Sequence, residues 1–351
     1  MKKRLLSFLV AAVTMITVAA VPVSAATGPK YFRWQGNTRY ETSLEAADAV
    51  KRNIWDNNKM DGVVLATGTN FPDALTGAVL ANRVYDKSVP LLLVDPGNPN
   101  QAYNFCVNNV KSNGRIYLLG GTNALSSSLE SRLRTSFDVQ RISGGDRYET
   151  NLNILKQMDA YEGPMIMATG SNYPDALAAS GTGIPIMIVD KSGLTSAQSQ
   201  FLKANKSRFY RIIFLGGEAA IPTSVENQVK SIMTSSSSQR ISGQTRYETS
   251  YRLADLIWGE DGLWKCNGMT LVTGTNFPDG LSAGPIVYWY DQPIILVNKD
   301  SGSDSSWATM WCRNYVDAAN GAEINLLGGE TVVPKWLVAN ITGWPVNQQY
   351  R

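Results

Sequence analysis

The chain has 351 residues, of which 44% are hydrophobic and 17% are charged, with 30 Gly and 15 Pro. This composition excludes collagen-like, coiled-coil and disordered classes, and the length allows two or three domains. The sequence contains no histidine, which excludes His-based catalytic triads, histidine general bases and most zinc sites.

The first 25 residues have the organisation of a secretory signal peptide. A basic segment at residues 2–4 precedes an apolar run that ends in small residues, which predicts cleavage after Ala25 or Ala26. The alternative, a membrane anchor, is less favoured because Pro22 and Ser24 interrupt the apolar run. Cleavage removes three of the 32 Lys+Arg residues and no acidic residue, so the remaining basic residues equal the 29 Asp+Glu residues in number and the net charge is zero. Any anion site must therefore be local, and no membrane span is expected after cleavage.

The chain has three cysteines, Cys106, Cys266 and Cys312. Secretion would expose them to oxidising conditions, in which disulfides can form. A disulfide-stapled scaffold needs more cysteines in a shorter chain. Three buried thiols are therefore the preferred interpretation. A disulfide between Cys266 and Cys312 is the alternative that the sequence leaves open.

Three sequence blocks recur in the same order three times. Arg-Tyr-Glu-Thr stands at 39–42, 147–150 and 246–249; a loop that first reads Thr-Gly-Thr-Asn-Phe-Pro-Asp stands at 67–73, 169–175 and 273–279; Leu-Gly-Gly stands at 119–121, 215–217 and 327–329. The equivalent arginines are 108 and 99 residues apart, which indicates tandem units of similar size. We expect repeats at 27–138, 139–238 and 239–351, which leave no segment for a separate catalytic domain.

Each unit alternates between short apolar runs and helical patterns. The apolar runs predict buried parallel strands, at 63–66, 90–94 and 116–119, at 165–168, 185–189 and 212–215, and at 269–272, 293–297 and 324–327. A further short strand is expected to run into each of Arg33, Arg141 and Arg240. The alternation predicts an α/β fold with a doubly wound parallel sheet in each of three modules.

Each Arg-Tyr-Glu-Thr block places an arginine in the first turn of a predicted helix. The preceding Thr or Asp and the Glu three residues later form a capping box, which accounts for the start of the helix. The capping box does not account for Arg39, Arg147 and Arg246, because the helix dipole disfavours a cation at this position. Each arginine is therefore expected to have a partner, either an internal carboxylate or an external anion.

The Asn-Phe/Tyr-Pro-Asp loops follow a strand and open the next helix. Structural capping is the preferred interpretation, because Asn caps helices and a carboxylate is favourable near a helix N-terminus. The functional alternative is that the Asn amides meet hydroxyl or phosphate groups of a ligand. These loops gather at the carboxyl edge of a parallel sheet, where open α/β sheets bind ligands. The candidate binding residues are therefore Arg39, Arg147, Arg246, Asn70, Asn172, Asn276, Asp73, Asp175 and Asp279.

Other repeated features have structural explanations. The Gly-Gly pairs resemble phosphate-binding turns only weakly, since neither Gly-x-Gly-x-x-Gly nor a Walker lysine is present, and close packing of strand against helix explains them as well. Arg33, Arg141 and Arg240 are expected to form salt bridges at strand ends. The tyrosines of the Arg-Tyr-Glu-Thr blocks are expected to lie half-buried against their own helices. Seven of the nine tryptophans crowd the third unit, where packing between units is favoured over a sugar-stacking surface.

The three blocks closely resemble those of the cell wall-binding repeat 2 (CWB2) family of secreted Gram-positive surface proteins. The resemblance covers essentially the whole chain after the signal peptide. It implies three Rossmann-like modules packed as a pseudo-threefold ring and noncovalent attachment to an anionic, teichoic-acid-like wall polymer. It also implies a binding site in loops near the module interfaces, which points to Arg39, Arg147 and Arg246. The first unit has Trp34-Gln35 in place of Ile-Ser and the third has Gly280 in place of Ala, so the three sites need not be equivalent.

The leading hypothesis is a secreted, non-catalytic protein of the cell wall or cell surface that binds an anionic wall polymer. It requires no catalytic residue, metal ion, cofactor or nucleic acid, and it leaves other surface-layer proteins open as partners. The alternative is a wall-active carbohydrate or peptidoglycan hydrolase that uses a carboxylate pair such as Glu41 and Asp73. Threefold repetition of the site argues against that alternative. A nucleotide-binding module, the third hypothesis, rests on fold analogy alone.

Overall fold

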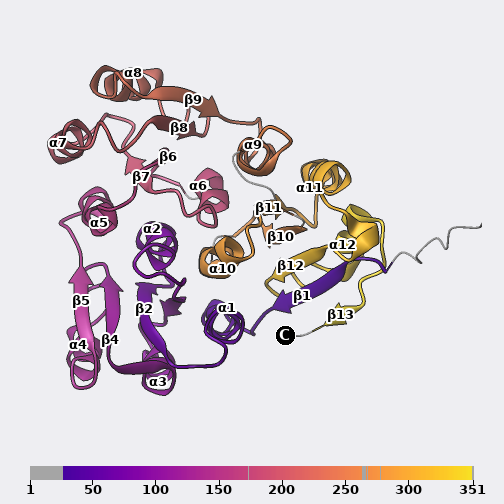
Figure 1. Cartoon of the computed structure of the whole chain (residues 1–351), viewed down its shortest axis with the longest axis horizontal. Coiled ribbons are helices and arrows are strands. Elements are labelled where there is room, and N and C mark those ends of the chain that lie inside the picture. The colour runs from indigo at the N-terminus through magenta and orange to yellow at the C-terminus, as the bar shows by residue number, and fades with distance from the viewer. Residues whose placement is uncertain (1–26, 173, 263–265, 267, 277, 350–351) are drawn as a thin grey trace, which may run out of the picture.

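The computed structural model describes residues 27–349 except 173, 263–265, 267 and 277. The predicted signal peptide therefore lies outside the described residues. The chain forms three parallel β-sheets, arranged as a ring around a centre of three helices (Figure 1). Among the described residues, no helix combines the length and the apolar character that crossing a bilayer requires.

Each sheet and its helices make up one module. The first module contains β2 (Met60–Thr67), β3 (Leu91–Val94), β4 (Val110–Leu119) and β5 (Asp138–Ile142), with α1 (Arg39–Ile54), α2 (Pro72–Ala81), α3 (Asn100–Asn109) and α4 (Ser127–Leu133). The second contains β6 (Pro164–Thr169), β7 (Ile186–Val189), β8 (Arg211–Leu215) and β9 (Ser237–Ile241), with α5 (Arg147–Leu155), α6 (Pro174–Ala179), α7 (Ser196–Ala204) and α8 (Thr223–Ile232). The third contains β10 (Gly268–Thr273), β11 (Ile294–Val297), β12 (Glu323–Leu327), β1 (Lys30–Trp34) and β13 (Gln348–Gln349), with α9 (Arg246–Trp258), α10 (Pro278–Trp289), α11 (Gly302–Tyr315) and α12 (Lys335–Thr342).

The predicted strands and the doubly wound fold class are confirmed. The strand order is β3-β2-β4-β5 in the first module and β7-β6-β8-β9 in the second, and all of these pairs are parallel. The third sheet has the corresponding order β11-β10-β12-β1 and adds β13 at its edge. The strands read as continuous apolar runs because helices cover both faces of a parallel sheet.

The strand that opens each sequence repeat completes the sheet of another module. β5 pairs with β4 and β9 pairs with β8, although both strands lead into the next Arg-Tyr-Glu-Thr helix. β1 pairs with β12 at the far end of the chain, from Lys30 beside Glu323 to Trp34 beside Leu327. The modules of the fold are therefore shifted by one strand from the repeats in the sequence, and β1 closes the ring.

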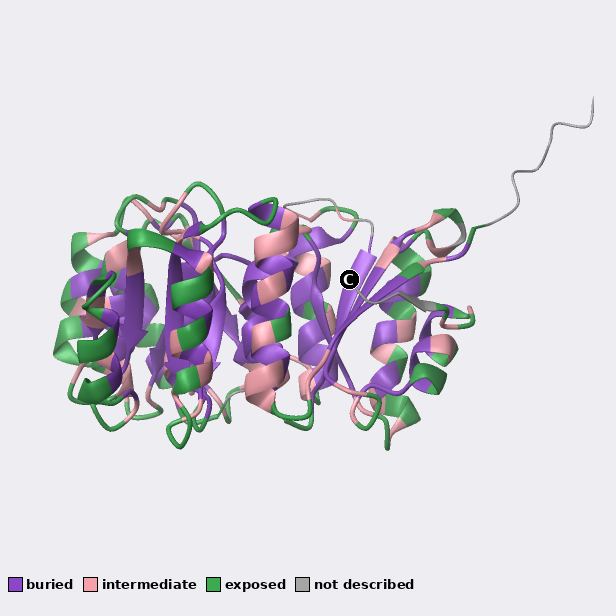
Figure 2. Ribbon diagram, turned by 90° about the horizontal axis from the view of Figure 1, so that it is seen from below, coloured by how far each residue is buried: buried purple, intermediate pink, exposed green. Residues whose placement is uncertain are grey.

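The first helix of each module packs against the central helix of its neighbour: α1 against α10, α5 against α2 and α9 against α6. The centre of the ring is packed closely enough to require glycine. A Cβ atom at Gly284 on α10 would lie 2.7 Å from Ala78 Cβ on α2 and 2.8 Å from the Ser180 carbonyl oxygen that follows α6. The strands and the central helices are buried, and exposed residues lie on the outer helices and loops (Figure 2).

Two expectations about side chains are settled by the packing. The three cysteines are free thiols, with Cys106 and Cys312 buried, so the alternative disulfide is not formed. Trp344 of the third unit packs against Gly28 of the first, as the prediction of packing between units has it, but other tryptophans of the third unit pack within that unit, so the prediction is right only in part. The Trp311 ring, for example, lies 4.4 Å from that of Tyr315 and 6.4 Å from that of Tyr251, because α9 and α11 are neighbours in one module. Trp264 lies outside the described residues.

Candidate functional site

The repeated arginine is the first residue of α1, α5 and α9. The residue before it, Thr38 in the first copy, caps the helix by accepting a hydrogen bond from the backbone N–H of Glu41 at 3.2 Å. The Nη1 group of each arginine donates a hydrogen bond to the carbonyl oxygen of a glycine in the Thr-Gly-Thr/Ser-Asn loop of its own module. These bonds join Arg39 to Gly68 at 2.9 Å, Arg147 to Gly170 at 2.6 Å and Arg246 to Gly274 at 2.7 Å. A neutral carbonyl thus fixes each arginine without neutralising its charge.

The repeated glutamate holds the turn before the same helix. Glu41 Oε2 accepts a hydrogen bond from the backbone N–H of Asn37 at 2.6 Å, one residue before the cap. In the second copy, Glu149 accepts from the Gly145 N–H at 2.7 Å. The predicted capping box is therefore right in its Thr/Asp half, while the carboxylate reaches one residue further back than the box requires.

The repeated aspartate meets the arginine of the next module around the ring. Asp73 lies beside Arg147, Asp175 beside Arg246, and Asp279 beside Arg39. Burial raises the pKa of each carboxyl above its ordinary value, and the positive charge of the nearby arginine opposes that rise. The internal carboxylate expected for the arginines is therefore present, and it is supplied across a module interface. The last of the three pairs joins the two ends of the chain.

The threonine that ends each Arg-Tyr-Glu-Thr block is a site residue that the sequence analysis quoted without giving it a role. The Thr42 hydroxyl is hydrogen-bonded to the Asp279 carboxylate, and the Thr249 hydroxyl to Asp175. The Thr42 hydroxyl oxygen also accepts from the Gly36 N–H at 3.1 Å. Its recurrence in all three copies was the available signal.

The first glycine of each Gly-Gly pair makes room for the same aspartate. Gly120, Gly216 and Gly328 have φ values of +96°, +112° and +93°. A Cβ atom at these positions would lie 2.5 Å from Asp73 Oδ2, 2.8 Å from Asp175 Oδ2 and 2.6 Å from Asp279 Oδ2, respectively. The packing explanation of the Gly-Gly pairs is confirmed, because an aspartate side chain of the protein occupies the space beside the first glycine of each pair.

The earlier arginine of each repeat holds this glycine loop in place. Arg33 donates to the Gly328 carbonyl at 2.6 Å, Arg141 to Gly120 at 2.8 Å and Arg240 to Gly216 at 2.8 Å. The predicted salt bridges form in two copies, Arg141 with Glu130 at 2.8 Å and Arg240 with Glu226. Each of the three arginines also donates to a second carbonyl: the buried Arg33 to Val333 at 2.7 Å, Arg141 to Leu125 at 2.8 Å and Arg240 to Ile221 at 3.0 Å.

The repeated tyrosine packs against the glycine loop rather than only against its own helix. A Cβ atom on Gly68 would lie 2.3 Å from the Tyr40 ring, and one on Gly170 would lie 2.4 Å from the Tyr148 ring. The Tyr148 hydroxyl donates to Asp190 Oδ2 at 2.7 Å. These tyrosines therefore fix the loop whose carbonyl orients the arginine.

The repeated asparagines are exposed on the loops beside the arginines. Asn70 does not cap α2 as expected: its Oδ1 accepts from the neighbouring Phe71 N–H at 3.0 Å, and Phe71 itself occupies the N-cap position. Pro72, at the first position of the helix, has no N–H to donate, which lowers the need for a cap. The Asn side chains thus stand at the surface of the site.

Two of the module interfaces contain open cavities that bring these groups together. A cavity of about 290 Å³ is bordered by Asn172, Asp175 and Arg246, with Lys191 as an additional cation. A cavity of about 420 Å³ is bordered by Asn276, Asp279 and Arg39. Lys191 was missed by the sequence reasoning, although it follows β7 at the same sheet edge.

The interface between the first and second modules brings further side chains of the described residues together. There the Arg147 guanidinium lies over the Phe71 ring, 5.8 Å from its centroid. The Asn151 amide on α5 joins the two modules by donating to the Thr76 hydroxyl on α2 at 3.3 Å, and it also donates to the Ile186 carbonyl within its own module at 2.8 Å. Asn151 stands where the other two copies have Ser43 and Ser250, so the three interfaces are related but not identical in sequence.

The three interfaces bring the same kinds of polar group together. Each one combines a half-buried guanidinium, the N-terminal turn of a helix and exposed loop amides, a set that suits phosphate and hydroxyl groups. Among the described residues, no group of three or more Cys, Asp or Glu side chains is placed to hold a metal ion.

Comparison with known proteins agrees with this repeated architecture. The model of cell wall binding domain 2 (CWB2) matches residues 33–130, 141–226 and 240–338. The chain is 29% identical over 273 residues to a protein named amidase enhancer and 24% identical over 304 residues to N-acetylmuramoyl-L-alanine amidase LytC, both from Bacillus subtilis (strain 168). These alignments cover 77% and 85% of this chain, but only 35% and 55% of the relatives.

Two solved structures from Clostridium difficile share the fold. Cwp6 matches 96% of this chain with a TM-score of 0.74 and 20% identity, and Cwp8 matches 90% with a TM-score of 0.72 and 21% identity. The chain spans about half the length of each, 51% and 52%. The family model, by contrast, matches most of the sequence in three consecutive copies. The chain belongs to the cell wall binding domain 2 (CWB2) family.

Proposed function

We propose that this protein is a secreted, non-catalytic protein that attaches noncovalently to the cell wall by binding an anionic secondary polymer at its module interfaces. The observation that carries the proposal is the threefold recurrence of one arrangement, in which Arg39, Arg147 and Arg246 each stand at a helix N-terminus beside a neighbouring module. The family supports binding to the cell wall. The anionic polymer is the more specific part of the proposal.

The chemistry of the interfaces supports a ligand that carries both phosphates and hydroxyls. A planar guanidinium binds phosphate oxygens in a bidentate manner, and the adjacent helix N-terminus favours the same negative charge. Asn70, Asn172 and Asn276 supply amides for hydroxyl groups. Lys191 adds a second cation at one cavity. Because the chain without its first 25 residues has no net charge, this local clustering is what distinguishes a polyanion site from general adhesion.

The aspartates have a different role in this proposal. Asp73, Asp175 and Asp279 are largely buried, and an aspartate beside the arginine reduces its attraction for an anion. We assign them to the interface itself and to polymer hydroxyls that reach it. Because the aspartate's negative charge opposes the arginine's attraction for an anion, the affinity of each single site is low. Three such sites on one ring reach a higher overall affinity when they bind one polymer or neighbouring strands together.

Substitution of the arginines tests the proposal. We expect each single variant, R39Q, R147Q or R246Q, to weaken binding to purified Gram-positive walls by less than about tenfold, and the triple variant by about a hundredfold or more, because the loss of avidity compounds. The matched control is the triple variant R132Q, R134Q and R313Q, which removes the same charge from exposed positions on other helices. If the two triple variants fold and bind equally well, the arginine sites are refuted.

The alternative hydrolase receives no support from the described residues. Glu41, one member of the suggested carboxylate pair, accepts a hydrogen bond from the Asn37 backbone and shapes a turn. Release of glycan fragments from purified walls by the protein would nonetheless overturn its assignment as non-catalytic.

A further inference from the structure

The three interface sites differ at one position, in the turn that follows the second strand of each module. β3, β7 and β11 end at equivalent valines, since the register pairs Val94 with Thr67, Val189 with Thr169 and Val297 with Thr273. The second residue after each of these strands is Pro96, Lys191 and Lys299, respectively. The interfaces therefore share their arginine and aspartate, but not the charge that this turn brings to the sheet edge.

The turn that carries Lys191 is held by hydrogen bonds of its own. The Gly193 N–H donates to the Asp190 carbonyl at 3.2 Å. The Asp190 carboxylate accepts from the Ser192 N–H at 2.9 Å and from the Tyr148 hydroxyl at 2.7 Å. Of Asp190 and Lys191, it is the lysine that borders the cavity between the second and third modules. The turn thus places an exposed cation at the rim of that cavity.

The equivalent positions of the other two modules do not supply such a cation. Pro96 carries no charge. Lys299 Nζ lies 2.7 Å from Asp300 Oδ1, and Lys299 does not border the cavity at Arg39. Lys191, by contrast, forms no salt bridge among the residues that the structure describes. The second cation is therefore a property of one interface.

The two open cavities consequently differ in their balance of charge. At the first, two cations, Arg246 and Lys191, accompany the single carboxylate of Asp175. At the second, one cation, Arg39, accompanies one carboxylate, Asp279. An excess of positive charge in a partly enclosed cavity attracts an anion more strongly than a balanced pair does.

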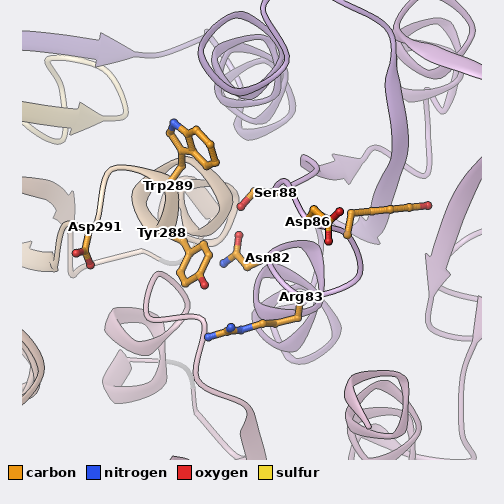
Figure 3. A pocket seen from close by; sticks show the side chains of 8 residues that line it. Asn82, Arg83, Asp86, Ser88, Tyr288, Trp289 and Asp291 are labelled. Carbon is orange, nitrogen blue, oxygen red and sulfur yellow. The ribbon is translucent and has the colours of Figure 1, made fainter. Parts of the chain in front are cut away.

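Excess positive charge is not a general property of the cavities in this protein. A cavity of about 620 Å³ at the C-terminal ends of α2 and α10 is bordered by Arg83, Asp86 and Asp291 (Figure 3). Its arginine is engaged within the protein, because Arg83 Nε donates to the Gly183 carbonyl at 2.8 Å. Carboxylates outnumber cations there, so the smaller cavity at Arg246 is distinguished by its charge and not by its size.

We propose that the cavity between the second and third modules is the principal anion site of the ring, in which Arg246 holds one phosphate of a polyanion and Lys191 contacts the adjoining part of the same chain. Arg246 is fixed by the Gly274 carbonyl, and a planar guanidinium binds phosphate with a defined geometry. A lysine ammonium is a point charge on a flexible stem, so Lys191 can follow a phosphodiester chain out of the cavity. This inference rests on the proposed function and goes beyond it, because it ranks the three sites and assigns the ranking to one residue.

Calorimetric titration of the whole protein with a synthetic oligomer of glycerol phosphate tests this proposal. K191Q removes the charge of an exposed side chain, so it is not expected to affect folding. We expect K191Q to weaken binding of the oligomer by about fivefold or more in about 0.05 M salt and by less in about 0.15 M salt, because salt screens exposed charges.

The matched control is K299Q, which makes the same change at the equivalent position of the third module. Because Lys299 is paired with Asp300 outside the cavity, K299Q should alter the affinity by less than about twofold. Equal affinities of K191Q and K299Q for the oligomer would overturn the proposal.

A double-mutant cycle locates the effect of the lysine. Because Lys191 and Arg246 contact one chain segment in this proposal, K191Q should weaken binding much less in an R246Q background than in the parent. In an R39Q background, K191Q should weaken binding by at least the same factor as in the parent. An equal effect in both backgrounds would show that the lysine acts through the overall charge of the protein, which would overturn its assignment to this site.

The outcomes separate this inference from the proposed function. If the parent binds the oligomer and the R39Q, R147Q and R246Q triple variant does not, the arginine sites are supported, and the comparison of K191Q with K299Q decides the ranking alone. If neither the parent nor any variant binds the oligomer, the proposed function and the ranking both fail.

Discussion

Gly216 and Gly217 are adjacent, yet the structure predicts opposite outcomes when each is replaced by alanine. Gly216 has a φ of +112°, and a Cβ there would lie 2.8 Å from Asp175 Oδ2 and 3.0 Å from Ala220 Cβ. A left-handed backbone costs a non-glycine residue about 1–2 kcal/mol, and forcing the carboxylate aside adds about 1–2 kcal/mol of overpacking. We therefore expect G216A to lower the free energy of unfolding by about 2–4 kcal/mol.

The matched variant is G217A. No atom lies within 4 Å of a Cβ at Gly217, and its φ is outside the left-handed range. Alanine there should leave the free energy of unfolding unchanged or raise it by about 0.4–1 kcal/mol, because it restricts the unfolded chain. Urea unfolding followed by both circular dichroism and tryptophan fluorescence measures the two variants, and coincident transitions establish that the analysis is two-state. Equal unfolding midpoints for G216A and G217A would refute the conclusion that Gly216 is required to make room for the Asp175 side chain.

Three further predictions concern ionisation. Burial raises the pKa of Asp73 despite the neighbouring arginine, so the folded state favours the neutral carboxyl, and this contribution to stability is lost as the pH rises through the folded-state pKa. We therefore expect D73N to be more stable than the parent at about pH 7 and equally stable at about pH 3. A D73N variant that is less stable than the parent at neutral pH would contradict this prediction. Burial alone would raise the pKa of Glu226, but hydrogen bonds from Lys230 and Arg240 outweigh it and lower the pKa. The stability from Glu226 is therefore present above its unfolded-state pKa and lost as the pH falls through the folded-state value, so E226Q should be destabilised in urea at about pH 7 and match the parent at about pH 3; equal loss at both would count against the ion pair. Burial raises the pKa of Cys106 to about 12, so iodoacetamide at about pH 8 should label this thiol only after unfolding, and labelling of the native protein would show that the site is open.

Local features of the fold can be predicted from the sequence. The buried strands, the helix starts at Thr38 and its copies, and the gathering of the repeated loops at the sheet edge all depend on residues close in the chain. The pairing of β1 with β12 could not be predicted from the repeats, because a tandem repeat has the same pattern wherever its unit is taken to begin. A contact from Lys30 to Glu323 is fixed by packing of the whole ring.

The same limit applies to the sites. Arg39 and Asp279 were each selected as candidates from recurrence, and an internal carboxylate was one of the two partners considered for the arginines. Which aspartate meets which arginine depends on how neighbouring modules are docked. The shortness of α6, which has 6 residues where α2 has 10, was visible in the sequence only as the shorter spacing of the second repeat.

Co-sedimentation with purified Gram-positive walls, before and after hydrofluoric acid removes the phosphodiester-linked polymers, tests the central claim most directly. The claim is that the module interfaces bind an anionic wall polymer. We predict that the protein binds intact walls, that stripping abolishes this binding, and that the R39Q, R147Q and R246Q triple variant fails to bind even before stripping. Undiminished binding to stripped walls would contradict the account and point to peptidoglycan as the ligand.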